Sequence, residues 1–233
     1  MVQSINIKAL TTLASVIRRP YLASPHVQVN TISELNYTAL RDRCGIKAII
    51  FDKDNTLTAP YEISTHPLAL PGLRSALETF GHTNVAILSN SAGTNDDPDY
   101  RDAAAIETHL GVSVIRHAEK KPGGLSEVLK HFEGCGVTAP SELCVVGDRL
   151  LTDVVFGNLY GMLTVHTLPL CRGEENRGDN LVAACVRSVE NKALYADWFG
   201  GRMVRERTLP HKVWPGEAEC PLVMRSDVGD GRE

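Results

Sequence analysis

Between residues 46 and 166, short apolar runs alternate with segments of helical periodicity, and this alternation limits the possible fold more than any other feature. The runs are four to six residues long and rich in β-branched residues, as expected of strands buried on both faces of a parallel sheet. Strands joined to helices by short links imply right-handed crossovers, and therefore an α/β fold with a doubly wound parallel sheet. The expected strands are 46–51, 84–88, 112–115, 143–146 and 162–166, and the expected helices are 73–80, 102–110, 123–132 and 152–160.

The segments on either side of this alternating core are less regular. Apolar residues recur at helical spacing over residues 4–19, and Pro20 ends the pattern. We expect residues 21–37 to be irregular and a short helix to follow, ending at about Cys44. Beyond the core, we expect an amphipathic helix over residues 181–199 and a mobile tail after about residue 215. The chain is therefore divided into an N-terminal segment 1–43, a core 44–170 and a C-terminal segment 171–233.

Composition limits the partners of the chain. A net charge of −4 and a pI near 6.1 argue against nucleic acid, whose binding depends on clustered Lys and Arg. The six cysteines are scattered without CxxC spacing, so neither a zinc site nor a thioredoxin-like motif is indicated, and a reducing compartment is favoured. No apolar stretch approaches the roughly 18 residues that a membrane-spanning helix needs.

The first residues of the chain have an unusual charge pattern. No Asp or Glu precedes Glu34, whereas Lys8, Arg18 and Arg19 are basic. This composition is typical of a mitochondrial transit segment or of a helix lying on a membrane surface. An ordinary amphipathic helix packed on its own domain would share it, so the segment alone leaves these interpretations open.

The first expected strand ends in the sequence FDKDNTL, residues 51–57. The carboxylates of Asp52 and Asp54 directly after a buried strand would repel one another unless a cation lies between them, and Mg²⁺ suits such oxygen ligands. Asp52 can then attack phosphorus, while Asp54 protonates the leaving oxygen and later activates water. An Asp pair that merely caps a turn is the structural alternative.

Polar residues also follow the second and third expected strands, where ligands bind in an open parallel sheet. Ser89 and Asn90, in the sequence LSNSAG, expose side-chain and backbone donors that can hold a phosphate oxygen, although a plain turn has the same composition. Lys121, directly before Pro122 and preferred to Lys120 for that reason, can neutralise both the nucleophile and the phosphate, although a solvated pair of surface lysines has the same sequence.

The fourth expected strand ends in VVGDRLLTDV, residues 145–154. Gly147 allows a tight turn, and Asp148 is expected to be the third carboxylate ligand of Mg²⁺, beside Asp52 and Asp54. Asp153 begins the next helix, where it could bind Mg²⁺ through water, orient Lys121, or only interact with the helix dipole.

Together, in this order, these segments resemble the four motifs of the haloacid dehalogenase superfamily over roughly residues 44–170. The matching residues are Asp52, Asp54, Thr56, Ser89, Lys121, Asp148 and Asp153. The resemblance implies a Mg²⁺-dependent phosphatase that forms a phospho-aspartyl intermediate on Asp52. The acid Asp54 favours a phosphatase over a dehalogenase, which needs no acid for its leaving group.

Two further features concern the substrate. Only 37 residues separate Asp52 from Ser89 and 32 separate Ser89 from Lys121, which leaves no room for a large cap domain and predicts an open site for a large substrate. The amino-acid sequences of the four motifs, together with the basic N-terminal helix before them, are similar to those of the mitochondrial phosphatidylglycerophosphate phosphatase family. The similarity covers roughly residues 1–200. This resemblance implies dephosphorylation of phosphatidylglycerophosphate, on the route to cardiolipin, at the matrix side of the inner membrane.

Two alternatives remain at this point. A phosphatase without a cap could act on a phosphoprotein or a nucleotide. A protein with this fold could also serve as a membrane-associated scaffold without turnover, although a degenerate member would be expected to lack one of the four matching catalytic or metal-binding residues Asp52, Asp54, Lys121 and Asp148.

Overall fold

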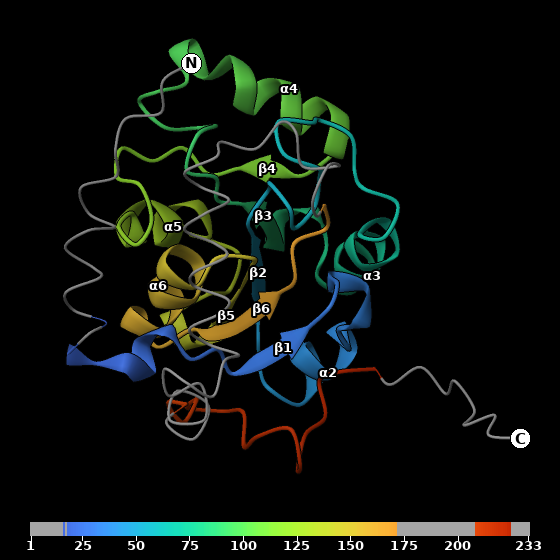
Figure 1. Ribbon diagram of the computed structural model, residues 1–233, viewed down its shortest axis with the longest axis vertical. Helices are drawn as coiled ribbons and strands as arrows, with labels where there is room; N and C mark the ends of the chain where they lie inside the picture. The colour runs from blue at the N-terminus through green and yellow to red at the C-terminus, as the bar shows by residue number, and fades with distance from the viewer. Residues whose placement is uncertain (1–15, 17, 172–207, 225–233) are drawn as a thin grey trace, which may run out of the picture.

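All six strands of the sheet run parallel, so their carboxyl ends lie along one edge. The computed structural model describes residues 16, 18–171 and 208–224. The strand order is β1-β6-β5-β2-β3-β4 (Figure 1), which confirms the predicted doubly wound α/β fold. The strands are β1 (Val27–Val29), β2 (Ala48–Phe51), β3 (Val85–Ile87), β4 (Ser113–Val114), β5 (Leu143–Gly147) and β6 (Leu163–Thr167).

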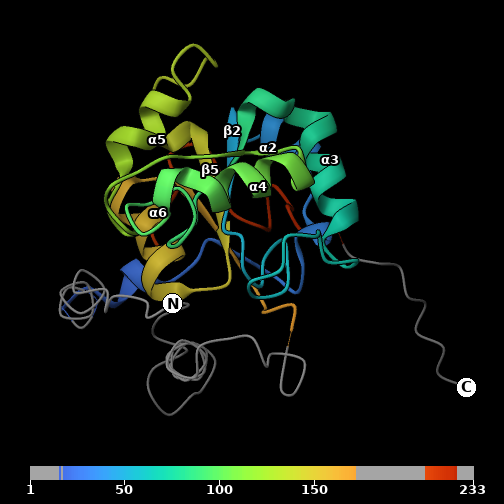
Figure 2. The ribbon, with the colours of Figure 1, turned by 90° about the horizontal axis from the view of Figure 1, so that it is seen from above.

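Helices cover both faces of the sheet. The α-helices are α2 (Tyr37–Asp42), α3 (Leu70–Phe80), α4 (Arg101–Leu110), α5 (Leu125–His131) and α6 (Val155–Tyr160), and the π-helical turn η6 (Leu150–Val154) precedes α6. Side chains of α2, α3 and α4 pack in one core, and those of α5 and α6 pack in another. Figures 1 and 2 show α5 and α6 on the opposite side of the sheet from α3.

The sequence of the central strand β2 is apolar throughout because both of its faces are buried. Ile49 and Phe51 belong to the core beneath α2, α3 and α4, whereas Ala48 and Ile50 belong to the core beneath α5 and α6. Successive side chains of a strand point to opposite faces, so both sets must be apolar when helices cover both faces. The continuous apolar run therefore places β2 in the middle of the sheet.

The prediction of irregular structure over residues 21–37 is wrong for the edge strand β1. Val27 pairs with Val165 and Val29 pairs with Thr167 of β6, so this segment extends the parallel sheet. Three residues are too few to show a strand period in the sequence, and the neighbouring Pro25 is typical of loops. The strand depends on pairing with β6, which is more than a hundred residues away along the chain.

The expectation of a mobile tail after about residue 215 is wrong for residues 216–224. Leu222 is fully buried, its carbonyl accepts the Asn36 N–H at 2.8 Å, and the Met224 N–H donates to the Glu34 carbonyl at 2.7 Å. The Trp214 indole N–H donates to the Cys220 carbonyl at 2.9 Å. The segment packs as a turn over residues 217–219 and a bridge between Val223 and Leu35, and neither gives the sequence a helical period to detect.

Two predicted helices, residues 4–19 and 181–199, lie almost entirely or entirely outside the described residues. The described part of the chain holds no helix with the length and apolar character needed to cross a bilayer. The interval between β2 and α3 and the interval between β3 and α4 are both described, and neither contains a separate cap domain.

Candidate active site

The motif residues meet at the carboxyl edge of the sheet. Asp52 follows β2, Ser89 follows β3, and Asp148 follows β5 directly. Lys121 lies in the loop after β4, and Asp153 lies in η6. The parallel arrangement brings these side chains together although they span about a hundred residues of sequence.

Lys121 joins two of the carboxylates. Its Nζ lies 2.6 Å from Asp52 Oδ1 and 2.5 Å from Asp153 Oδ1, and the Lys121 side chain is 2% exposed. Burial alone would lower the pKa of Lys121, but the carboxylates of Asp153 and Asp52 outweigh it and raise that pKa. Lys121 is therefore a cation in this site at every physiological pH.

The surroundings of Asp52, the candidate nucleophile, shift its pKa in opposite directions. Burial raises its pKa, Lys121 opposes that shift, and Asp153 adds to it, so the net pKa lies above the ordinary value. The guanidinium of Arg149 acts in the same direction as Lys121. The Arg149 backbone N–H also donates to Asp153 Oδ2 at 3.1 Å, which holds the Asp153 side chain toward Lys121.

The described part of the chain contains one group of carboxylates that could hold a metal ion. One oxygen from each of Asp52, Asp148 and Asp153 lies within 4.8 Å of the others. Asp148 and Asp153 are each 1% exposed, and burying charge without compensation is costly. The three carboxylates outnumber the two nearby cations, Lys121 and Arg149. Carboxylate oxygens are also the ligands that hard divalent cations prefer. The residues present therefore fit a divalent metal.

The carboxylate of Asp54, which the sequence predicted to ligate the metal, lies outside this group of three. Its Oδ1 accepts from Lys53 Nζ at 2.6 Å and from the Tyr61 backbone N–H at 3.0 Å. The chain turns directly after β2, because the Lys53 carbonyl accepts the backbone N–H groups of three residues. Those residues are Thr56, Leu57 and Thr58. Asp153 is the third member of the carboxylate group, and which of Asp54 and Asp153 ligates a metal stays a prediction.

Ser89 and Asn90 shape the loops that surround the carboxylates. Ser89 Oγ accepts the backbone N–H groups of Ser91 and Ala92, and Ser89 is 2% exposed. Asn90 Oδ1 accepts the Lys121 backbone N–H at 2.8 Å and so ties the loop after β3 to the lysine loop. Both residues lie where the sequence predicted, and their role toward phosphate remains a prediction.

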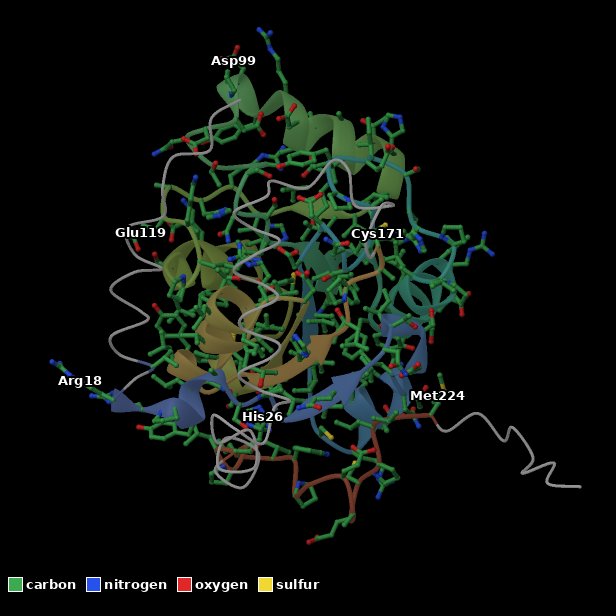
Figure 3. The ribbon with its side chains drawn as sticks, viewed as in Figure 1. Arg18, His26, Asp99, Glu119, Cys171 and Met224 are labelled. Carbon is green, nitrogen blue, oxygen red and sulfur yellow. The ribbon has the colours of Figure 1, made fainter. Side chains whose placement is uncertain are left out.

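Two residues of the first motif make contacts that the motifs alone do not predict. Lys53 pairs with Asp54 while Lys121 pairs with Asp52, and a lysine between two aspartates does not by itself show which of them it pairs with. Asn55, with a positive φ of 61°, ties the segment after β6 to the first motif, because its Oδ1 accepts the Cys171 N–H at 3.2 Å. Figure 3 labels Cys171, which marks this part of the molecule.

Gly147 is required by the position of Asp153. A Cβ atom at residue 147 would collide with the Asp153 carboxylate. Gly147→Ala is therefore expected to lower kcat/KM by about 10²-fold, since misplacing an active-site group by about 1 Å has an effect of that size. Steady-state kinetics and a melting curve on the same sample would measure it.

Gly157→Ala is the matched control for this prediction. A Cβ atom there would collide with Thr164 Cγ2 in the packing between α6 and β6 rather than with a carboxylate. It should lower the melting temperature while the folded protein keeps its activity. Wild-type activity in Gly147→Ala would mean that the Asp153 position does not matter.

The comparisons with known proteins agree with this geometry. A family model described as mitochondrial PGP phosphatase matches residues 7–170. The chloroplastic/mitochondrial phosphatidylglycerophosphate phosphatase 1 of Arabidopsis thaliana is 45% identical over 176 residues, covering 74% of this chain and 49% of that protein. The chloroplastic one of Chlamydomonas reinhardtii is 46% identical, covering 67% of this chain and 57% of that protein.

A mitochondrial phosphatidylglycerophosphatase of Saccharomyces cerevisiae is 35% identical over 157 residues, covering 67% of this chain and 83% of that protein. The chain thus spans about half the length of the plant and algal relatives and most of the yeast one. The family model covers well over half of the chain, and the resemblance drawn from the four motifs is confirmed. The chain belongs to the mitochondrial phosphatidylglycerophosphate phosphatase family.

Proposed function

We propose that this protein is a Mg²⁺-dependent phosphoric monoester hydrolase that works through a phospho-aspartyl intermediate on Asp52. The observation that carries the proposal is the group of the partly buried Asp52 and the buried Lys121, Asp148 and Asp153 at the carboxyl edge of the sheet. Phosphoryl transfer needs mainly positioning and charge stabilisation, and this group supplies both. Mg²⁺ held by Asp52, Asp148 and Asp153 would neutralise the negative charge that the phosphate brings into the site.

The side chains divide the reaction into two displacements. In the first, an oxygen of Asp52 forms a bond to phosphorus, the bond to the leaving oxygen breaks, and Asp54 donates a proton to that oxygen. In the second, Asp54 takes a proton from water, which attacks phosphorus and releases Asp52 and inorganic phosphate. Lys121 stays protonated throughout and balances the charge of Asp52 and of the phosphoryl oxygens.

We propose phosphatidylglycerophosphate as the substrate, with phosphatidylglycerol as the lipid product in cardiolipin synthesis. The names of the plant and yeast relatives support this choice. The absence of a cap domain in the two described intervals after β2 and β3 supports it as well, because an open site admits a large substrate. A phosphoprotein or nucleotide phosphatase is the second candidate, which the same openness would allow.

One assay separates these candidates. Phosphate release with Mg²⁺ would be compared for phosphatidylglycerophosphate in detergent, a phosphopeptide and a nucleotide monophosphate at equal concentrations. The proposal predicts a kcat/KM for the lipid that exceeds the others by at least about 10²-fold, within the range that differential binding of a polar group provides. Preference for the peptide or nucleotide would favour the second candidate, and no release from any would favour a silent scaffold.

We further propose that the enzyme works peripherally on an anionic membrane surface, at the matrix side of the mitochondrial inner membrane. Relatives named as mitochondrial support the compartment. Exposed apolar side chains in the loop after the first motif support the surface: Tyr61, Ile63 and Leu68. The predicted helix over residues 4–19 would add Lys8, Arg18 and Arg19, each contributing about 1 kcal/mol near anionic lipid. The lipid assay would be repeated on anionic vesicles with a variant that lacks residues 1–19. If the enzyme works on the membrane surface, this variant should lose activity on vesicles but not on detergent-dispersed lipid.

A further inference from the structure

Lys53 is a buried cation that has no role in the two displacements proposed above. It is 5% exposed, and its Nζ lies 2.6 Å from Asp54 Oδ1. Within the described part of the chain, Asp54 is its one ion-pair partner. A lysine loses hydration and side-chain entropy when it is buried in this way, so a specific contact must compensate for both losses.

Two donors meet on the same oxygen of Asp54. The Tyr61 backbone N–H donates to Oδ1 at 3.0 Å, beside the Lys53 ammonium. No donor among the described residues contacts Oδ2, and the Asp54 side chain is 31% exposed. Two donors on one oxygen, one of them charged, fix the rotation of a carboxyl group about its Cβ–Cγ bond. The Asp54 carboxyl therefore has one fixed oxygen and one open oxygen.

We propose that Lys53 is a positioning residue that holds Asp54 Oδ1 and so makes Oδ2 the atom that carries the proton. In the first displacement, Oδ2–H gives its proton to the leaving oxygen as the phosphorus–oxygen bond breaks. In the second, Oδ2 takes a proton from the attacking water. Lys53 exchanges no proton in either step. This inference rests on the proposed function, because it assigns a role within that reaction.

A purely stabilising role explains the pair less well. Replacing a buried ion pair by apolar side chains is often neutral or stabilising, so the pair is weak evidence for a contribution to stability. The loop already has backbone bonds of its own, since three N–H groups donate to the Lys53 carbonyl. The ammonium group adds a fixed orientation of the Asp54 carboxyl, which a general acid requires.

The test compares two leaving groups. An alkoxide needs a proton as it departs, whereas p-nitrophenolate is stable without one, and kcat/KM excludes the later hydrolysis of the phosphoenzyme. Lys53→Met should lower kcat/KM for phosphatidylglycerophosphate in detergent by about 10²-fold, the lower end for loss of a general acid. For p-nitrophenyl phosphate the loss should stay below about tenfold. Lys53→Arg, which keeps the cation, should restore most of the lipid activity.

Lys47→Met is the matched control, because Lys47 also forms a single ion pair, with Glu142 at 2.8 Å, and lies partly exposed at the protein surface. It should leave the ratio of the two kcat/KM values unchanged. If Lys53→Met does not fold, Lys53→Gln carries the same prediction, since it keeps a polar group in the pocket without the charge.

A double-mutant cycle with Asp54→Asn decides whether Lys53 acts through Asp54. If it does, Lys53→Met adds little to the loss already caused by Asp54→Asn, because residues that act as a unit are not additive. Additive losses, or equal losses on both substrates, would overturn the inference. The proposed function fails by a different result, namely wild-type protein that hydrolyses neither substrate.

Discussion

Asp52→Asn is expected to lower turnover by at least about 10⁴-fold, in line with the loss seen when an enzyme nucleophile is removed. An amide oxygen is too weak a nucleophile to attack phosphorus, so the first displacement cannot begin. The fold should be kept, because Lys121 retains its ion pair with Asp153 in the buried site. Phosphate release, circular dichroism and a melting curve would measure both effects.

Asp42→Asn is the control for this substitution. Asp42 is also an aspartate paired with a cation, since it lies 2.7 Å from Arg41, but it is half exposed on α2 and outside the carboxylate group. It should leave turnover unchanged. Near-normal turnover in Asp52→Asn would contradict the assignment of the nucleophile.

Removing divalent metal should abolish activity, and Mg²⁺ should restore it. Without the metal, the carboxylates of Asp52, Asp148 and Asp153 would repel an incoming phosphate dianion, and Lys121 and Arg149 cannot balance all of that charge. Ca²⁺ should restore activity poorly, because its looser coordination can draw both oxygens of Asp52 onto the metal. Phosphate release during titration with EDTA, followed by each cation, would measure this.

A binding measurement separates metal loss from damage to the protein. An ion that binds only the folded state stabilises it by an amount that grows with the ratio of ion concentration to Kd, so Mg²⁺ should raise the melting temperature of the wild type and have much less effect on Asp148→Asn. Full activity in excess chelator, or equal stabilisation of both proteins by Mg²⁺, would remove the metal from the account.

The sequence was most informative where burial on both faces of the sheet forces a local pattern. The strand β2 is an example, because its alternating side chains enter two different cores and must all be apolar. The same burial makes the polar residues directly after β2 and β5 conspicuous. The sequence alone therefore locates Asp52 and Asp148 at one edge of the sheet, where the structure has them.

The sequence was least informative where long-range contacts decide the structure. The strand β1 and the segment around Leu222 are held by partners far away in the chain, and neither is long enough to show a period. The orientation of the Asp54 carboxylate has a local cause, and whether Asp54 ligates a metal stays a prediction. A carboxylate two residues after Asp52 would share its side only if the strand continued, but the chain turns there and Asp54 meets Lys53 instead.

Trapping the phosphoenzyme tests the central claim most directly. The protein would be mixed with substrate carrying a labelled phosphoryl group, quenched with acid during turnover, digested and analysed by mass spectrometry. The account predicts one labelled peptide that contains Asp52, loss of the label with hydroxylamine, as expected of an acyl phosphate, and no label in Asp52→Asn. Turnover without any trapped label, or a label on a histidine such as His117, would contradict it.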